Sequence, residues 1–227
     1  MNAEEKIKEC EFNLNQIKHF DPDPYYVNHF FTSFIKSVNQ TYNQIFKEAN
    51  DDFGLFVVGN CNKENFLQKA FIKNDQKAVE FVKWFESKIK TEHETPYPNF
   101  IKYVCYYQKK FNKLPKIKIM IRAKERFQND INQEIKVNLA NGKIRSKEEL
   151  DIEIKRNMPV FLEVINQKRS SNNEPKINQK QITTSTFMQN NEHENFEIVY
   201  ASEIYIPVLK RILSESREKI KENTVWK

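Results

Sequence analysis

One stretch of the chain has the pattern of a single long helix with a wide apolar face. Asp23, a residue type that caps helix N-termini, and Pro24, which suits the first helical position, precede YYVNHFFTSFIKSVNQTYNQIFKEA, residues 25–49. Its large apolar side chains recur at steps of three and four residues, with one adjacent pair at the end: Val27, Phe31, Phe34, Val38, Tyr42, Ile45 and Phe46. Because so broad a stripe needs partners on more than one side, we expect this helix to be the centre of an N-terminal core.

Further helical patterns surround this segment. Apolar residues recur with helical spacing in residues 3–18, 64–72 and 75–90, and again in a segment that opens at Pro98. Several amphipathic helices within about 112 residues predict a helical bundle over residues 1–112.

The pattern changes after residue 112. Ile117, Ile119 and Ile121 alternate with polar or basic residues, which is the period-two signature of a strand. A second alternation runs into Asn141-Gly142, the strongest short hairpin signal, and KIR follows as a brief return strand.

The remaining segment combines one clear helix start with an illegible region. Ser146 followed by Glu149 is a capping box that predicts a helix start, and a helical pattern resumes from about Pro207, whereas residues 180–200 have no clear pattern. We therefore predict a mainly α fold, with an N-terminal helical bundle (1–112) and a smaller α+β part (113–227). The second part is expected to hold a basic strand, a short β-hairpin and C-terminal helices.

Composition and motifs argue against familiar enzyme classes. The chain has only 3 Gly, and it contains no G-x-S-x-G elbow, H-E-x-x-H helix or Gly-rich dinucleotide turn. Cys10, Cys61 and Cys105 are far apart, and no C-x-x-C pair could hold zinc. The start of the chain is charged, and nowhere do 18 apolar residues run together. We predict a non-catalytic cytoplasmic protein with buried thiols, no cofactor, no metal and no membrane contact.

Positive charge is concentrated in one segment, KKFNKLPKIKIMIRAKERF, residues 109–127. It carries one acid, Glu125, and eight basic residues: Lys109, Lys110, Lys113, Lys116, Lys118, Arg122, Lys124 and Arg126. Its charge of +7 exceeds the +6 of the whole chain, so the rest of the chain is close to neutral. Cations that neutralise phosphates, interleaved with aromatic rings such as Tyr106 and Phe111, suit single-stranded nucleic acid. RNA or DNA is the predicted partner, and a solvated basic face is the alternative.

Two other functions stay open at this point. Glu134 and Lys136 form an E-x-K pattern that, in a metal-dependent nuclease, holds magnesium and positions a water molecule. The aromatic helices could instead serve a protein-interaction or dimerisation scaffold, which makes a homo-oligomer a candidate partner. Glu-His-Glu occurs around His93 and again around His193, in polar connections where we expect solvated loops.

The aromatic segments VNHFFTSFIKSVNQTYNQIFKEA and AVEFVKWFESKIK resemble those of HEPN domains, over roughly the first half of the chain. HEPN domains are small helical bundles, often dimeric, many of which cleave or bind RNA. Their catalytic signature is an arginine followed four to six residues later by a histidine, on a late helix that would correspond to NFIKYVCYYQKKFNKLP. No arginine of this chain is followed by a histidine at that distance. The resemblance therefore implies a helical scaffold without the ribonuclease centre.

Overall fold

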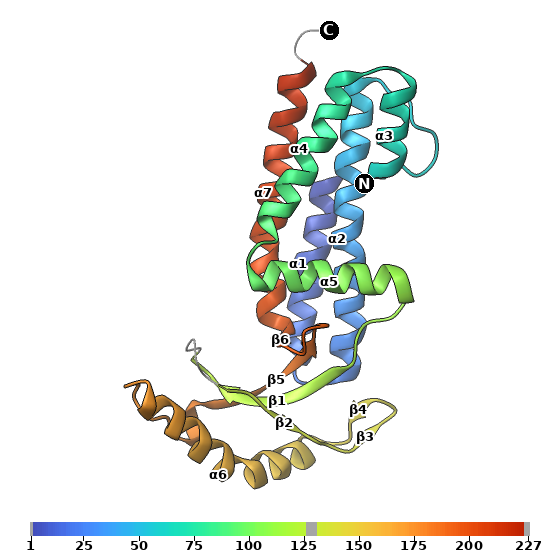
Figure 1. Ribbon diagram of the computed structural model, residues 1–227. Coiled ribbons are helices and arrows are strands. Elements are labelled where there is room, and N and C mark those ends of the chain that lie inside the picture. Colours follow the sequence, from blue (N-terminus) through green and yellow to red (C-terminus); the bar gives the residue numbers. More distant parts are fainter. Residues whose placement is uncertain (1, 126–130, 225–227) are drawn as a thin grey trace. The chain divides into compact units, whose positions relative to one another are not determined.

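The computed structural model describes residues 2–125 and 131–224, and these residues fold mainly into helices, which confirms the predicted fold class (Figure 1). The helices are α1 (Ala3–Phe20), α2 (Pro24–Phe53), α3 (Lys63–Ile72), α4 (Gln76–Glu92), α5 (Pro96–Phe111), α6 (Lys147–Ser171), the 3-10 turn η1 (Gln179–Gln181) and α7 (Ile198–Thr224). The strands are β1 (Ile117–Ala123), β2 (Gln133–Ile135), β3 (Leu139–Ala140), β4 (Lys143–Ile144), β5 (Ile182–Gln189) and β6 (Asn195–Glu197).

The chain divides into two compact units. Unit 1 comprises Met1–Asn15, Phe31–Leu114 and Tyr200–Lys227, and unit 2 comprises Gln16–Phe30 and Pro115–Val199. These bounds differ from the expected division at residue 112 in two segments. The end of α1, the turn after it and the start of α2 belong to unit 2, and most of α7 belongs to the helical unit, because their contacts are made with residues distant in sequence.

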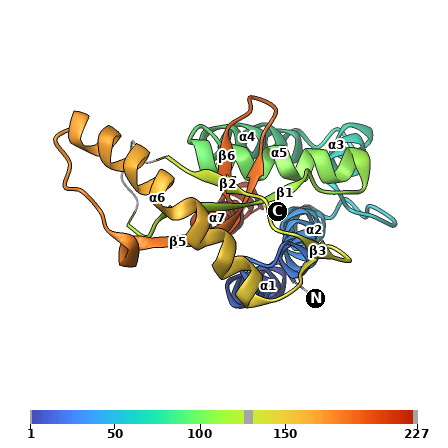
Figure 2. The ribbon, with the colours of Figure 1, turned by 90° about the horizontal axis from the view of Figure 1, so that it is seen from below.

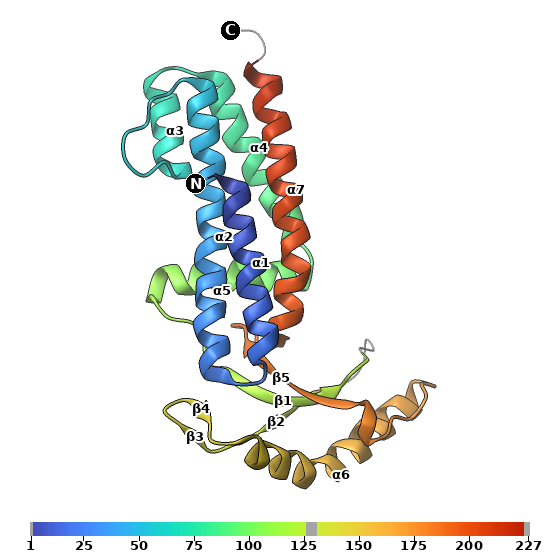
Figure 3. The same ribbon diagram turned by 180° about the vertical axis from the view of Figure 1, so that it is seen from behind.

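Unit 1 is a helical bundle with an aromatic core. Figure 3 shows α1, α2, α4 and α7 running alongside one another. The ring centroid of Phe81 on α4 lies 5.9 Å from that of Phe46 on α2 and 6.0 Å from that of Phe66 on α3, and all three side chains are fully buried. The start of α4 follows the capping rule, since the Asp75 carboxylate accepts a hydrogen bond from the backbone N–H of Ala78. The long stripe on α2 thus has partners on several sides, as expected.

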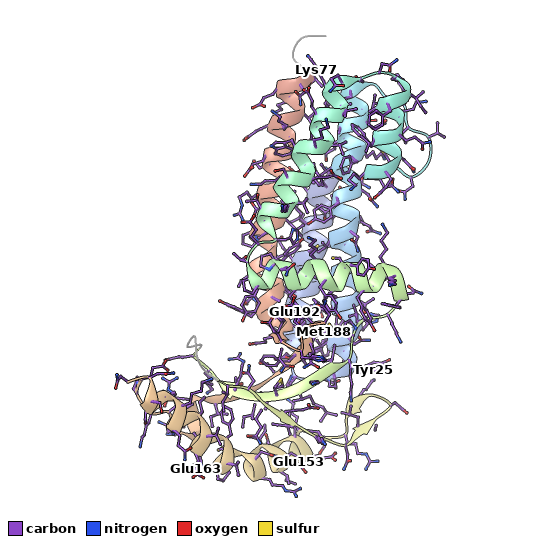
Figure 4. The ribbon with its side chains drawn as sticks, viewed as in Figure 1. Tyr25, Lys77, Glu153, Glu163, Met188 and Glu192 are labelled. Atoms are coloured by element: carbon purple, nitrogen blue, oxygen red, sulfur yellow. The ribbon has the colours of Figure 1, made fainter. Side chains whose placement is uncertain are left out.

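Unit 2 contains a four-stranded antiparallel sheet of order β2-β1-β5-β6. Helix α6 lies across one face of this sheet (Figure 2), where its Phe161 and Ile165 pack against Ile121 and Ile135 in a common apolar core. Figure 4 shows Glu163 on the side of α6 that faces away from the sheet. One face of the sheet is therefore closed by an amphipathic helix.

Local patterns in unit 2 were predicted with mixed success. The strand from Ile117 is confirmed as β1, and the hairpin is confirmed as β3 and β4, joined by Asn141 and Gly142 with φ values of 53° and 81°. Residues 180–200, which had no legible pattern, form β5, β6 and the start of α7. Most of β5 is buried, so its residues lack the alternation of a half-exposed strand.

Candidate functional site

The last three turns of α5 carry a row of exposed cations. Lys102, Tyr106 and Lys109 follow one another at steps of four and three residues, Lys110 lies beside them, and all four are exposed. We call these four residues the α5 basic face. Helix α5 contains no Asp or Glu, so no carboxylate on the helix itself offsets this charge. Lys113 follows directly after the left-handed cap at Asn112 and is also exposed.

Two aromatic rings are exposed beside these cations. Tyr106 is 61% exposed and Phe111 is 47% exposed. The Nζ atom of Lys110 lies 5.7 Å from the Tyr106 ring centroid and 5.2 Å from that of Phe111, which is cation–π distance. The end of α5 therefore combines uncompensated charge with flat apolar surface.

Of the basic residues expected to form one surface, the structure places Lys109, Lys110 and Lys113 in unit 1. Lys116, Lys118, Arg122 and Lys124 belong to unit 2, and Arg126 lies outside the described residues. Lys102, which sequence reasoning missed, joins the first group. The sequence signal that could have identified Lys102 was its four-residue step to Tyr106, which places both residues on one face of a helix.

The side chain of Arg122 is held inside unit 2. Its guanidinium donates to the carboxylate of Glu197 at 2.9 Å, to the hydroxyl of Ser185 at 3.2 Å and to the carbonyl of Ala123 at 2.7 Å. Glu197 is only 2% exposed. The positive charge of Arg122 is thus neutralised by a buried acid. Lys118 lies 3.6 Å from a carboxylate oxygen of Glu134, while Lys116 and Lys124 are exposed.

A pocket of about 470 Å³ lies next to the α5 basic face, within unit 1. Helix α2 contributes polar side chains to its wall, α5 contributes Gln108 and Lys109, and the N-terminal end of α3 contributes Lys63. Phe46 and Phe85 give it an apolar floor. We call it the α2–α5 pocket. Because Lys109 belongs to both features, the pocket and the basic face are adjacent.

His93 lies in a buried hydrogen-bond chain, so the expectation of a solvated loop is wrong for this residue. It caps the end of α4 and is 5% exposed. Its Nδ1 lies 2.5 Å from the carbonyl oxygen of Ile89, which can only accept, so Nδ1 carries the proton. Its Nε2 lies 2.8 Å from the Tyr205 hydroxyl, which lies 2.5 Å from the Tyr42 hydroxyl. Donation therefore runs from Tyr42 through Tyr205 to a neutral His93.

The neutral state of His93 makes stability depend on pH. Burial is the main cause that lowers the pKa of His93 below its ordinary value. In the unfolded chain the ring takes up a proton below a pH of about 6.5 that the folded chain does not bind. We therefore expect the free energy of unfolding to fall, as the pH is lowered from about 6.5 toward the lower folded-state pKa, by up to about 1.4 kcal/mol per pH unit.

Chemical denaturation at a series of pH values measures this effect, with His93→Gln as the matched variant that cannot titrate. The difference in free energy of unfolding between wild type and the variant should shrink as the pH falls through this window. A difference in free energy of unfolding that stays constant with pH would contradict the assignment of His93 as a neutral ring with a lowered pKa. Glu92 titrates in a separate range, because its hydrogen bond with Arg211 lowers its pKa to about 2.

The residues considered for metal-dependent cleavage lie on or next to β2. Glu134 and Lys136 are both exposed. Among residues 2–125 and 131–224, no group of three His, Cys, Asp or Glu side chains could hold a metal ion.

The cysteines are held as thiols in the helical unit. Cys10 and Cys61 are buried, as expected, and Cys105 is partly exposed. Burial raises the pKa of Cys61 to about 11 and that of Cys105 to about 12, so both stay protonated and unreactive at neutral pH.

Comparisons with known proteins add no relative. No protein-family model matches the chain, and no curated protein and no solved structure matches it. In the part of the chain that the structure describes, no helix has both the length and the apolar character needed to cross a bilayer. Function must therefore be inferred from the geometry of the site.

Proposed function

We propose that this protein binds single-stranded nucleic acid without cleaving it, and that the α5 basic face makes the main contact. The observation that carries the proposal is a helix free of acidic residues that exposes Lys102, Lys109 and Lys110 together with the ring of Tyr106. Cations neutralise phosphates, and exposed rings stack on bases, which single strands leave accessible. The HEPN-like character of the first half stays a prediction, and it agrees with an RNA partner.

Fluorescence anisotropy with short single-stranded RNA and DNA across a salt series tests the proposal. Affinity should fall steeply between about 50 and about 200 mM salt, because each neutralised phosphate contributes a slope of about −0.7. The double variant Lys110→Glu and Lys113→Glu should bind at least about 10-fold more weakly and lose about 1.4 of that slope.

Lys83→Glu with Lys90→Glu is the control, because it changes net charge equally on α4, where both lysines are exposed. Equal weakening by both double variants would mean that only net charge matters, which would contradict the assignment to α5. Lys116→Glu with Lys124→Glu measures any contribution from the exposed lysines flanking β1. A folded wild-type protein that binds no strand at low salt would refute the proposal.

The second candidate is a dimerisation scaffold, and one observation favours it. Ile152, Val160 and Val164 are 63%, 57% and 45% exposed along α6. A stable dimer without nucleic-acid affinity, seen by light scattering of the same preparations, would favour this function. The third alternative, a metal-dependent nuclease, requires cleavage that needs magnesium and is lost in Glu134→Gln and Lys136→Met.

A further inference from the structure

A row of carboxamide side chains on α2 faces the α2–α5 pocket. Lys36, Asn39, Gln40 and Asn43 follow one another at steps of three, one and three residues, so they lie on one side of the helix, and all four line the pocket. Asparagine is a poorer helix former than alanine by about 0.5 kcal/mol, and two copies in this row have no evident benefit for the helix itself.

The amide groups of this row are available to a ligand. Within the described part of the chain, no protein group hydrogen-bonds the side chains of Asn39, Gln40 or Asn43, and the same holds for Gln108 across the pocket. Each carboxamide offers two N–H donors and an acceptor oxygen. Paired donors and acceptors of this kind recognise the edges of nucleobases.

The floor of the pocket is aromatic. The ring of Phe85 lies 4.9 Å from that of Phe46 and 6.0 Å from that of Tyr42, measured between centroids, and each ring is held edge-on to the next. The hydroxyl of Tyr42 is already bonded to Tyr205, so Tyr42 offers the ligand its ring rather than its oxygen. An apolar floor below polar walls suits a flat heterocycle with hydrogen-bonding edges.

Positive charge lies at the rim. Lys36 and Lys109 are exposed, and neither pairs with an acid in the described part of the chain. Lys63 is less available, because its Nζ lies 2.7 Å from a carboxylate oxygen of Glu86. Glu64, which also lines the pocket, adds one negative charge. The two exposed lysines can neutralise a phosphate attached to the ligand.

We propose that the α2–α5 pocket takes one nucleotide of the bound strand, with the base between the carboxamides of Asn39 and Asn43 and the phosphate at Lys36 and Lys109. The proposal rests on the proposed function for its source of ligand, since Lys109 leads from the α5 basic face into the pocket. A volume of about 470 Å³ lies within the range of small-molecule sites. The pocket would then supply a base preference that α5 alone does not.

Titration with free nucleoside monophosphates tests the pocket separately from strand binding. We expect at least one of the four common nucleotides to bind wild-type protein, detected by calorimetry or ligand-observed NMR. The variant Asn39→Leu with Asn43→Leu should bind it at least about 10-fold more weakly, since both base contacts are lost. Leucine favours helix more than asparagine does, so this variant should stay folded.

Three controls make the result decisive. Gln68→Leu removes an exposed carboxamide on α3 outside the pocket and should change nothing. Ribose 5-phosphate, which lacks a base, should bind more weakly than the nucleotide. Lys110→Glu with Lys113→Glu should weaken strand binding at least about 10-fold yet leave nucleotide binding intact.

Failure of this inference and failure of the proposed function are distinguishable. No nucleotide binding, equal binding of ribose 5-phosphate, or an unchanged affinity in the Asn39 and Asn43 variant would each overturn the pocket assignment. Strand binding through α5 would be unaffected by those results. If the wild-type protein binds a free nucleotide but no strand, the proposed function is wrong and the pocket remains a site for free nucleotides.

Discussion

Phe81→Ala is expected to lower the free energy of unfolding by about 3–5 kcal/mol. Phe81 is fully buried, and its ring centroid lies within 6.3 Å of five other rings, those of Phe46, Phe53, Phe66, Trp84 and Phe85. Truncation removes apolar contact and leaves a cavity, because rings from three helices cannot all close on the space. Chemical denaturation followed by circular dichroism measures the change.

Phe71→Ala provides the matched control for this substitution. Phe71 lies on α3 and is 60% exposed, so the same change of residue type should alter stability by no more than about 0.5 kcal/mol. Similar decreases in the free energy of unfolding of both variants would show that burial of Phe81 is not what stabilises unit 1.

Arg122→Leu is expected to destabilise the protein by about 3–5 kcal/mol. The substitution leaves the 2% exposed carboxylate of Glu197 without its cation and removes a donor to Ser185. A buried carboxylate that loses a cationic partner is costly because the protein interior solvates the charge poorly. Thermal and denaturant unfolding measure the loss.

A second substitution separates this effect from lost packing. Arg122→Leu combined with Glu197→Leu should recover most of the stability, since the buried carboxylate is then removed together with its cation. Lys124→Leu, at an exposed basic position nearby, should have little effect. A single Arg122→Leu variant as stable as wild type would contradict the structural role and return Arg122 to the nucleic-acid surface.

The helices were predictable because their signals are local. Capping residues such as Asp75 and Ser146, and apolar residues three or four positions apart, act within a few turns of chain. The β3–β4 hairpin was predictable for the same reason, since Asn141 and Gly142 adopt the positive φ values that the turn requires.

The failure to predict β5 from the sequence has a physical explanation. From Ser185 to Met188, β5 is buried on both faces, so it shows no alternation of polar and apolar exposure. Its partner β1 lies 59 or more residues earlier in the chain, as in the pairing of Ala123 with Ile182. The backbone N–H and the hydroxyl of Thr186 also bond the carboxylate of Asp21, 165 residues away. No short window of sequence contains those contacts.

The candidate site also has features that the sequence showed and features that only the tertiary structure decided. The run of basic residues was visible in the sequence, but which of its charges are compensated depends on distant partners. Arg122 is neutralised by Glu197, 75 residues later, whereas Lys109 and Lys110 end a helix without acids. His93 looked like part of a polar loop, and it is buried because Tyr205 lies 112 residues further along.

Local order in this protein follows from residue spacing alone: the helix starts, the hairpin, and the position of the basic segment. Tertiary structure decided which residues meet, and hence that α2 and α5 enclose a pocket, that His93 is neutral and buried, and that the basic segment is shared between two units. The physical reason is the distance along the chain over which each interaction acts. Backbone propensities and caps act over a few residues, whereas burial and ion pairing join segments whose separation the sequence does not encode locally.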